Sequence, residues 1–259
     1  MFIQWFPVKK ISLLGSVLVL SFISMQATAD ENKVNVEQKT QSWGVNLGTT
    51  RVIYHPESSG AIISVSNPNN YPVLVQGSVS AEHKSAVKAP FIITPPLFRL
   101  NAAQQSQVRV VMTDDIAPKD RESLYWLCET GIPPELGDAW AEGRQPQKRN
   151  TAMLDVKVRL SQCIKLLVRP DSLTSTPGDV AEKIVWSKAG DKIVANNPTP
   201  FYMNLGALFV GGAEIKLPEY IPPMGTQSYT IPKGAYGDVS WQIINDLGGL
   251  STLYKSALN

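Results

Sequence analysis

The chain has 259 residues, with 24 lysines and arginines against 22 acidic residues. Its first 29 residues carry Lys9 and Lys10 and no acid, so the remaining 230 (259 − 29) balance 22 basic against 22 acidic residues. A neutral chain lacks the basic field on which non-specific nucleic-acid binding depends, which excludes nucleic acid as an expected partner.

Residues 1–29 have the form of a secretion signal. Lys9 and Lys10 precede an uncharged run over 11–25, and Ala27-Thr28-Ala29 is a small-x-small cleavage signature. A membrane span is the competing interpretation, but the run is shorter than the roughly 20 apolar residues that a spanning helix needs. We therefore predict an exported protein whose mature form begins near Asp30.

Short apolar or alternating runs follow, separated by Pro, Gly and Asn clusters, as is typical of strands. No segment longer than about ten residues has helical spacing, so an all-β, sandwich-like fold is expected. In the first half these runs are VNV at 34, RVIY at 51, AIISVS at 61, PVLVQGSVS at 72, FIIT at 91, SQVRVVM at 106 and SLYWLC at 123.

A polar stretch with two prolines, VRPDSLTSTPGD at 168–179, reads as a linker. About seven more strands follow it, the number in an immunoglobulin-like sandwich. We predict two such domains joined at a hinge, residues 30–169 and 170–259. The second set of runs is AEKIVW, DKIVANN, FYMNLGALFV, AEIKL, QSYTIP, DVSWQIIND and STLYKSA.

Two cysteines, Cys128 and Cys163, flank a polar Gly/Pro-rich segment at 131–150 that we expect to be a long loop. An even cysteine count in an exported chain favours a disulfide. A thiol-metal site is the alternative, but there is no CxxC motif, and His55 and His83 have no ligand spacing. A bridge would close a 35-residue loop, worth about 4 kcal/mol.

Enzyme signatures are absent: the sequence has no GxSxG, HExxH, GxxxxGK[ST] or GxGxxG. A triad built on His55 or His83 stays open, because triads assemble in space, but both histidines lie in polar segments and are expected at the surface. We expect no catalysis, cofactor, metal or small-molecule substrate.

The segment LDVKVRLSQCIKLLVRP at 154–170 is two-faced. In a strand, Leu154, Val156, Val158 and Leu160 share one face, opposite a charged face. Packing on the protein's own core is the simplest interpretation. The odd positions of Cys163 and Lys165 further suggest a bulge at Ser161-Gln162, which would aim the first half of the strand elsewhere.

Here the residues resemble a known family, the periplasmic chaperones of the chaperone/usher pathway, which escort pilus and fibre subunits. The long loop and the cysteine pair resemble its long-loop branch, which serves capsule-like or thin fibrous surface antigens. The similar segments run collinearly through both halves: TTRVIYHPESSGAIISVSNPNNYPVLVQ, FIITPPLFRL, RESLYWLCETGIPP, CIKLLVRP and NPTPFYMNLGAL.

The resemblance implies an ATP-independent mechanism. A fibre subunit of this family lacks the last strand of its sandwich, and the chaperone lends its own strand to the open groove. Leu154, Val156, Val158 and Leu160 match the alternating bulky positions of that donor strand. Complete burial of four such side chains has a gross value of about 6–12 kcal/mol before association costs.

Arg51 and Lys165 match the family's anchor for the subunit's C-terminal carboxylate, which fixes strand register. Val34 and Val36 are candidates for an N-terminal strand beside the donor strand. Pro133 and Pro134 resemble a proline pair near the face that contacts the outer-membrane usher, although simple loop stiffening would explain them equally well.

The resemblance also implies a periplasmic location and a self-dimer when no subunit is bound. The alternatives are a structural fibre subunit or adhesin with immunoglobulin-like domains, and a secreted hydrolase. A fibre subunit should carry a donor extension at its N-terminus, but residues 30–50 are short and polar.

Overall fold

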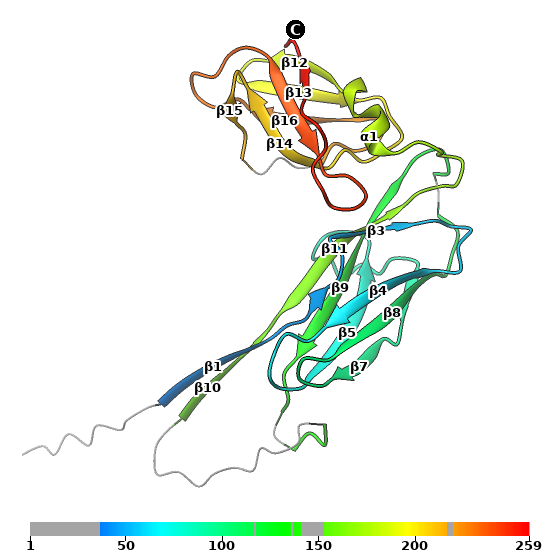
Figure 1. Cartoon of the computed structure of the whole chain (residues 1–259), viewed down its shortest axis with the longest axis vertical. Helices are drawn as coiled ribbons and strands as arrows, with labels where there is room; N and C mark the ends of the chain where they lie inside the picture. The colour runs from blue at the N-terminus through cyan, green and yellow to red at the C-terminus, as the bar shows by residue number, and fades with distance from the viewer. Residues whose placement is uncertain (1–36, 117, 136, 141–152, 217–219, 259) are drawn as a thin grey trace, which may run out of the picture.

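A computed structural model of the chain describes residues 37–116, 118–135, 137–140, 153–216 and 220–258. Two β-sandwiches lie one above the other, and a two-stranded ribbon projects from the far end of the N-terminal sandwich (Figure 1). None of the helices in these residues is long and apolar enough to cross a membrane. The expected signal at 1–29 and the valines Val34 and Val36 lie outside the described residues.

The N-terminal sandwich pairs a five-stranded sheet with a four-stranded one. In spatial order the five-stranded sheet contains β3 (Arg51–Tyr54), β11 (Ser161–Val168), β9 (Ser123–Ile132), β5 (Val73–Ser80) and β7 (Leu97–Leu100). The second sheet contains β2 (Asn46–Leu47), β4 (Ala61–Ser66), β8 (Gln105–Met112) and β6 (Phe91–Thr94). Only β3 runs parallel to its neighbour, β11; the other ladders of these two sheets are antiparallel.

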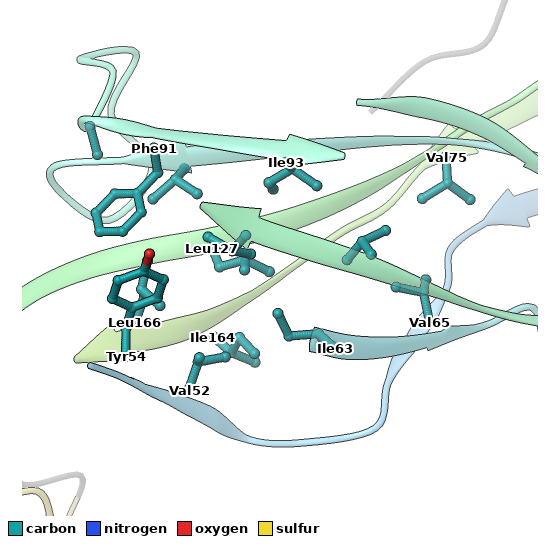
Figure 2. Packing of buried hydrophobic residues seen from close by; sticks show 14 of the residues in the cluster. Val52, Tyr54, Ile63, Val65, Val75, Phe91, Ile93, Leu127, Ile164 and Leu166 are labelled. Carbon is teal, nitrogen blue, oxygen red and sulfur yellow. The ribbon is translucent and has the colours of Figure 1, made fainter. Parts of the chain in front are cut away.

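Side chains that alternate along these strands meet between the sheets and form the core (Figure 2). In β4, Ile63 and Val65 are buried while Ile62 is exposed. Tyr54 packs edge-on against Phe91 of the opposite sheet, with ring centroids 5.3 Å apart. The period-two pattern of the sequence therefore gives each sheet one apolar face.

The C-terminal sandwich has its own core, with Trp186 and Trp241 packed at 5.4 Å between ring centroids. Its first sheet contains β12 (Val185–Ala189), β13 (Lys192–Asn197) and β16 (Gly225–Thr230). Its second contains β15 (Ala213–Glu214), β14 (Leu205–Val210), β17 (Val239–Ile243) and β18 (Tyr254–Ser256). The two separate cores confirm the all-β, two-sandwich class; the expected boundary at 169/170 stays a prediction.

Three local expectations need correction. The run AEKIVW is a strand only from Val185, because α1 (Pro177–Val180) and a 3-10 turn, η1 (Ala181–Lys183), precede it and bury Ala181. The run FYMNLGALFV becomes a strand only at Leu205. The loop expected at 131–150 begins after Ile132, because β9 continues through Gly131 and Ile132. Residues 141–152 of that loop are not described.

Candidate functional site: an exposed strand and a cleft between the domains

The ribbon consists of β1 (Glu37–Trp43) and β10 (Met153–Arg159), paired in parallel. On β10, Leu154 is 50% exposed, Val158 36% and Leu160, which follows the strand, 46%; Val156 is partly buried. Further along the same face, Ile164 of β11 is 5% exposed and lies in the core. One apolar row thus starts inside the N-terminal core and runs out of it along the ribbon.

The opposite face of β10 is held against the chain that follows β9. The Lys157 ammonium donates a hydrogen bond to the carbonyl of Pro134, which is buried, and Pro133 is partly buried beside it. Asp155 and Arg159 on this face are exposed. The charged face of the strand therefore contacts the protein itself through Lys157 alone among its three charged residues.

The expected bulge at Ser161-Gln162 is wrong. The β11–β9 register is continuous from Ser161 to Val168, so no extra residue is inserted at Ser161-Gln162. Leu160 is the single residue between β10 and β11; its N–H donates to Trp43 O at 2.8 Å and its carbonyl accepts from Gly131 N at 2.9 Å. Leu160 thus bonds to the end of β1 through its N–H and to β9 through its carbonyl, and it marks the point where the chain changes from pairing with β1 to pairing with β9.

Gly131 lets the ribbon cross the end of the sandwich. A Cβ at this position would lie 2.6 Å from the Trp43 carbonyl oxygen, closer than any real contact of that kind. The side chain of Trp43 is buried and packs against the tilted ring of Tyr71, with ring centroids 5.4 Å apart. The base of the ribbon is therefore built into the core.

Cys128 and Cys163 form the expected disulfide, and they are direct cross-strand partners on β9 and β11. Both sulfurs are used, so the alternative thiol-metal site is ruled out for this pair. Within the described residues no group of three or more His, Cys, Asp or Glu side chains could hold a metal ion. The bridge ties the root of the exposed strand to the central strand of its sheet.

The two basic residues singled out in the sequence are neighbours. Arg51 on β3 lies opposite Lys165 on β11 in the parallel register. The Arg51 guanidinium donates to the Ile244 carbonyl of the C-terminal sandwich at 3.1 Å, and burial lowers the pKa of Arg51. The Lys165 ammonium donates to Asn204 Oδ1 and lies 4.7 Å from the centroid of the Tyr220 ring.

Lys165 lines a cleft of about 500 Å³ between the two sandwiches. The cleft is rich in aromatic groups, and the tilted rings of His83 and Trp126 pack with their centroids 4.2 Å apart. His55 lies elsewhere, exposed, with its Nδ1 2.9 Å from Asp171 Oδ1. The residues that line the cleft are Ala81, Glu82, His83, Leu124, Trp126, Lys165, Tyr202 and Tyr220.

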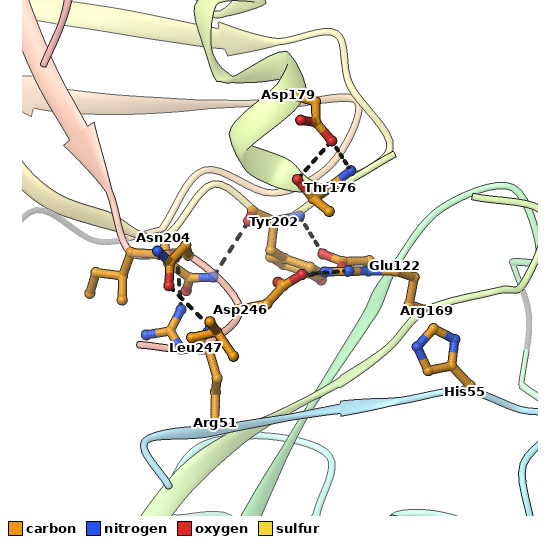
Figure 3. A network of polar contacts seen from close by, with 12 residues as sticks. Arg51, His55, Glu122, Arg169, Thr176, Asp179, Tyr202, Asn204, Asp246 and Leu247 are labelled. Atoms are coloured by element: carbon orange, nitrogen blue, oxygen red, sulfur yellow. Dashed lines mark hydrogen bonds and ion pairs between the residues drawn. The ribbon is translucent and has the colours of Figure 1, made fainter. Parts of the chain in front are cut away.

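An ionic network behind the cleft joins the two domains (Figure 3). Arg169, at the end of β11, donates from Nε to Glu122 Oε1 at 2.8 Å and from its two terminal nitrogens to Asp246 at 2.7 and 2.8 Å. Glu122 also accepts the Tyr202 N–H at 2.8 Å. The network fixes the position of the C-terminal sandwich, which supplies one wall of the cleft.

Burial dominates the electrostatics of this network. It raises the pKa of Glu122, while the Arg169 charge and the Tyr202 N–H act in the opposite direction. Burial lowers the pKa of Arg169, but the hydrogen bonds that its guanidinium donates to the two carboxylates, together with their negative charges, keep that pKa above its ordinary value. A cation shared by two carboxylates in a sheltered interface is therefore held in one geometry.

Sequence reasoning found the exposed strand, the disulfide and the Arg51–Lys165 pair, but it missed the network and Asn204. Arg169 and Glu122 are 47 residues apart, and Arg169 and Asp246 are 77 apart. No local spacing links such residues. The one available signal was that charges interrupt otherwise apolar segments, in VRP and in RESLYW.

Two immunoglobulin-like sandwiches, a cleft between them and an exposed strand rooted in the first sandwich define a class of two-domain binding protein. The family comparison specifies it further: residues 44–174 match the N-terminal domain of the PapD pili and flagellar-assembly chaperones, and residues 179–255 match the PapD C-terminal domain. The chain belongs to this family of pilus-assembly chaperones.

Among its relatives is the Escherichia coli protein named "Chaperone protein AggD", 46% identical over 87% of this chain and 89% of that protein. The crystal structure of the E. coli chaperone DraB has a TM-score of 0.77 and 42% identity, covering 86% of this chain and all of DraB. The Salmonella enterica chaperone SafB, solved in complex with the SafA pilin, has a TM-score of 0.76 and 44% identity over 86% of this chain and all of SafB.

Proposed function

We propose that this chain is a chaperone that completes pilus or fibre subunits by lending them strand β10. One observation carries the proposal: a row of apolar side chains lies outside the core on the ribbon, where most of it is exposed to solvent. The row consists of Leu154, Val156, Val158 and Leu160. An exposed apolar strand with a free edge is a template for adding a strand to another protein. The family membership and the solved complex of SafB with a pilin support this function.

Because the apolar side chains of the donor row are only about half exposed, burying them in a subunit's groove gains less free energy than complete burial would. Because Leu154, Val158 and Leu160 are already about half covered, each has roughly half of the 1.5–3 kcal/mol of complete burial still to gain, or about 0.7–1.5 kcal/mol. The gross gain over these three side chains is then about 2–4.5 kcal/mol, to which the more buried Val156 adds less, so the total is smaller than the 6–12 kcal/mol expected from the sequence. Such a gain suits a strand that must later be replaced.

Arg51 and Lys165 are proposed to bind the C-terminal carboxylate of the subunit. The two cations are register neighbours at the cleft, with Arg51 fixed by the Ile244 carbonyl. A guanidinium and an ammonium on one carboxylate make charge-assisted hydrogen bonds and set the register of the added strand. A slip by one residue would turn the charged face of β10 into the subunit's groove.

The remaining roles follow from family membership and stay proposals. The chaperone acts in the periplasm without ATP or a catalytic group, delivers its subunit to an outer-membrane usher and self-associates when unloaded. Pro133 and Pro134 are proposed to lie near the usher-contacting face, where the bond from Lys157 to the Pro134 carbonyl couples that face to the donor strand.

The test places a charge in the donor row. Val156→Asp is expected to reduce recovery of a co-expressed fibre subunit at least tenfold, because an unpaired carboxylate would enter an apolar groove. Val185→Asp is the matched control, since Val185 is 55% exposed on β12 of the other domain. The readout is the amount of subunit that copurifies per chaperone. Equal recovery with both variants would refute the donor role of β10.

A further inference from the structure

Glu129 is a buried acid that the proposed function does not use. It lies on β9, in the middle of the five-stranded sheet, and its side chain is 0% exposed. Neither carboxyl oxygen has a hydrogen-bond partner within the described part of the chain. Buried polar groups in folded proteins are nearly always paired, so an unpaired acid at the centre of a sheet calls for a specific account.

The surroundings of Glu129 fit a neutral carboxyl and not a carboxylate. Its register partners are Gly77 on β5 and Gln162 on β11. A Cβ at Gly77 would lie 2.8 Å from Glu129 Oε1 and 3.0 Å from the methyl carbons of Ile93 on β6, so the glycine provides the space for the acid. Among the hydrophobic residues that form this core, Tyr54, Tyr71 and Tyr125 carry titratable phenols. The other buried charged side chains of the described part of this sandwich are Arg51, Glu122 and Arg169, which lie at the joint with the C-terminal sandwich.

Glu129 lies directly beside the base of the ribbon. Two residues further along β9, the Gly131 N–H donates to the Leu160 carbonyl, where the ribbon joins the sheet. Gln162, the register partner of Glu129, accepts the Leu47 N–H at 3.2 Å and so bridges the two sheets at this end. Water entering the sandwich beside Glu129 would disturb both contacts.

We propose that Glu129 is a proton-dependent latch: it closes the end of the N-terminal sandwich when neutral, and its ionisation loosens the base of the β1–β10 ribbon. A neutral carboxyl tolerates an apolar site, whereas a carboxylate without a partner draws in water. The effect is a property of the free protein. Its consequence for subunits, weaker presentation of β10 as the pH rises, rests on the proposed donor function.

The direction of the pH dependence follows from the raised pKa. Burial raises the pKa of Glu129 from 4.5 to about 7. Below the pKa of Glu129 in the unfolded chain, the carboxyl is protonated in both the folded and the unfolded state, and the free energy of unfolding is not reduced by this group. The free energy of unfolding falls as the pH rises from about 4.5 to about 7, because in this range Glu129 ionises in the unfolded state and stays neutral in the folded state. Above about pH 7 the loss is complete.

Urea unfolding between pH 4 and 8.5 tests the latch. Over this pH range the unfolding constant of the natural protein should rise about 300-fold more than that of Glu129→Gln. The reason is that the pKa of Glu129 is 4.5 in the unfolded chain and about 7 in the folded one, a difference of about 300-fold in proton affinity. Glu57→Gln, a change of an exposed acid in the same sandwich, is the matched control and should follow the natural protein. Parallel profiles for the natural protein and Glu129→Gln would overturn the proposal.

Hydrogen-exchange protection factors locate the effect. Protection of β10 and of Leu160 should fall at least tenfold between pH 5.5 and 8 in the natural protein, while β17 of the C-terminal sandwich stays constant. Glu129→Leu, which removes the acid altogether, should hold β10 protection constant with pH, even if its overall stability differs. A pH-dependent ribbon in this variant would overturn the latch, whereas Val156→Asp, which tests the donor function, should leave the pH response intact.

Discussion

Loss of Arg169 should weaken the joint between the domains by an amount set by its buried partner. The Arg169 side chain is 6% exposed and that of Glu122 is 0% exposed. Arg169→Met would leave the Glu122 carboxylate with the Tyr202 N–H as its remaining described hydrogen-bond donor. Removing one partner of a buried ion pair costs about 3–5 kcal/mol, because the other charge stays buried without compensation. Asp246, 27% exposed, keeps some hydration and adds less.

The deficit of Arg169→Met should depend on pH. Burial already raises the pKa of Glu122 above 4.5, and Arg169 opposes that rise. Without the arginine the folded-state pKa rises further, so the folded variant takes up a proton more readily than the unfolded chain. The variant should come closest to the natural protein near pH 4, and the deficit should grow as the pH rises through the raised pKa.

Urea denaturation at pH 4.5 and pH 8, followed by tryptophan fluorescence, measures this deficit. Arg121→Met is the matched control, because Arg121 pairs with the exposed Asp120 at the surface and its loss should change little. A deficit for Arg169→Met no larger than that of the control at pH 8 would refute the reasoning. A deficit independent of pH would show that Glu122 does not ionise in the interface.

Two further changes test the site. Lys165→Ala should abolish recovery of a co-expressed subunit, while circular dichroism shows that the chaperone stays folded. Lys188→Ala, a change of an exposed lysine, is the control. An unchanged yield of subunit with Lys165→Ala would show that Lys165 does not bind the subunit's carboxylate. Replacing Cys128 and Cys163 together by serine should lower the free energy of unfolding by about 4 kcal/mol, because the bridge closes a loop of 35 residues. Equal urea midpoints for the double variant and the oxidised natural protein would contradict that value.

Local patterns were sufficient for most of the strands. Runs such as AIISVS and FIIT became β4 and β6 because side chains in a strand alternate between two faces, and the sequence records that period directly. The same reasoning failed at AEK before β12, where the strand period cannot be distinguished from a single helical turn in three residues. It also misplaced a bulge at Ser161-Gln162, because odd-numbered Cys163 and Lys165 simply continue the charged face.

The sequence by itself determined that residues 154–160 alternate between an apolar and a charged face, because alternation is a property of neighbouring residues. Only the tertiary structure decided that Leu166 lies in the core while Leu154 is half exposed, because β11 belongs to the five-stranded sheet and β10 to the two-stranded ribbon with β1. It also decided which charges meet, since Arg169, Glu122 and Asp246 come from distant segments. The unpaired burial of Glu129 is likewise a fact of packing, because nothing in its neighbours Cys128 and Thr130 shows that its side chain lies between the two sheets.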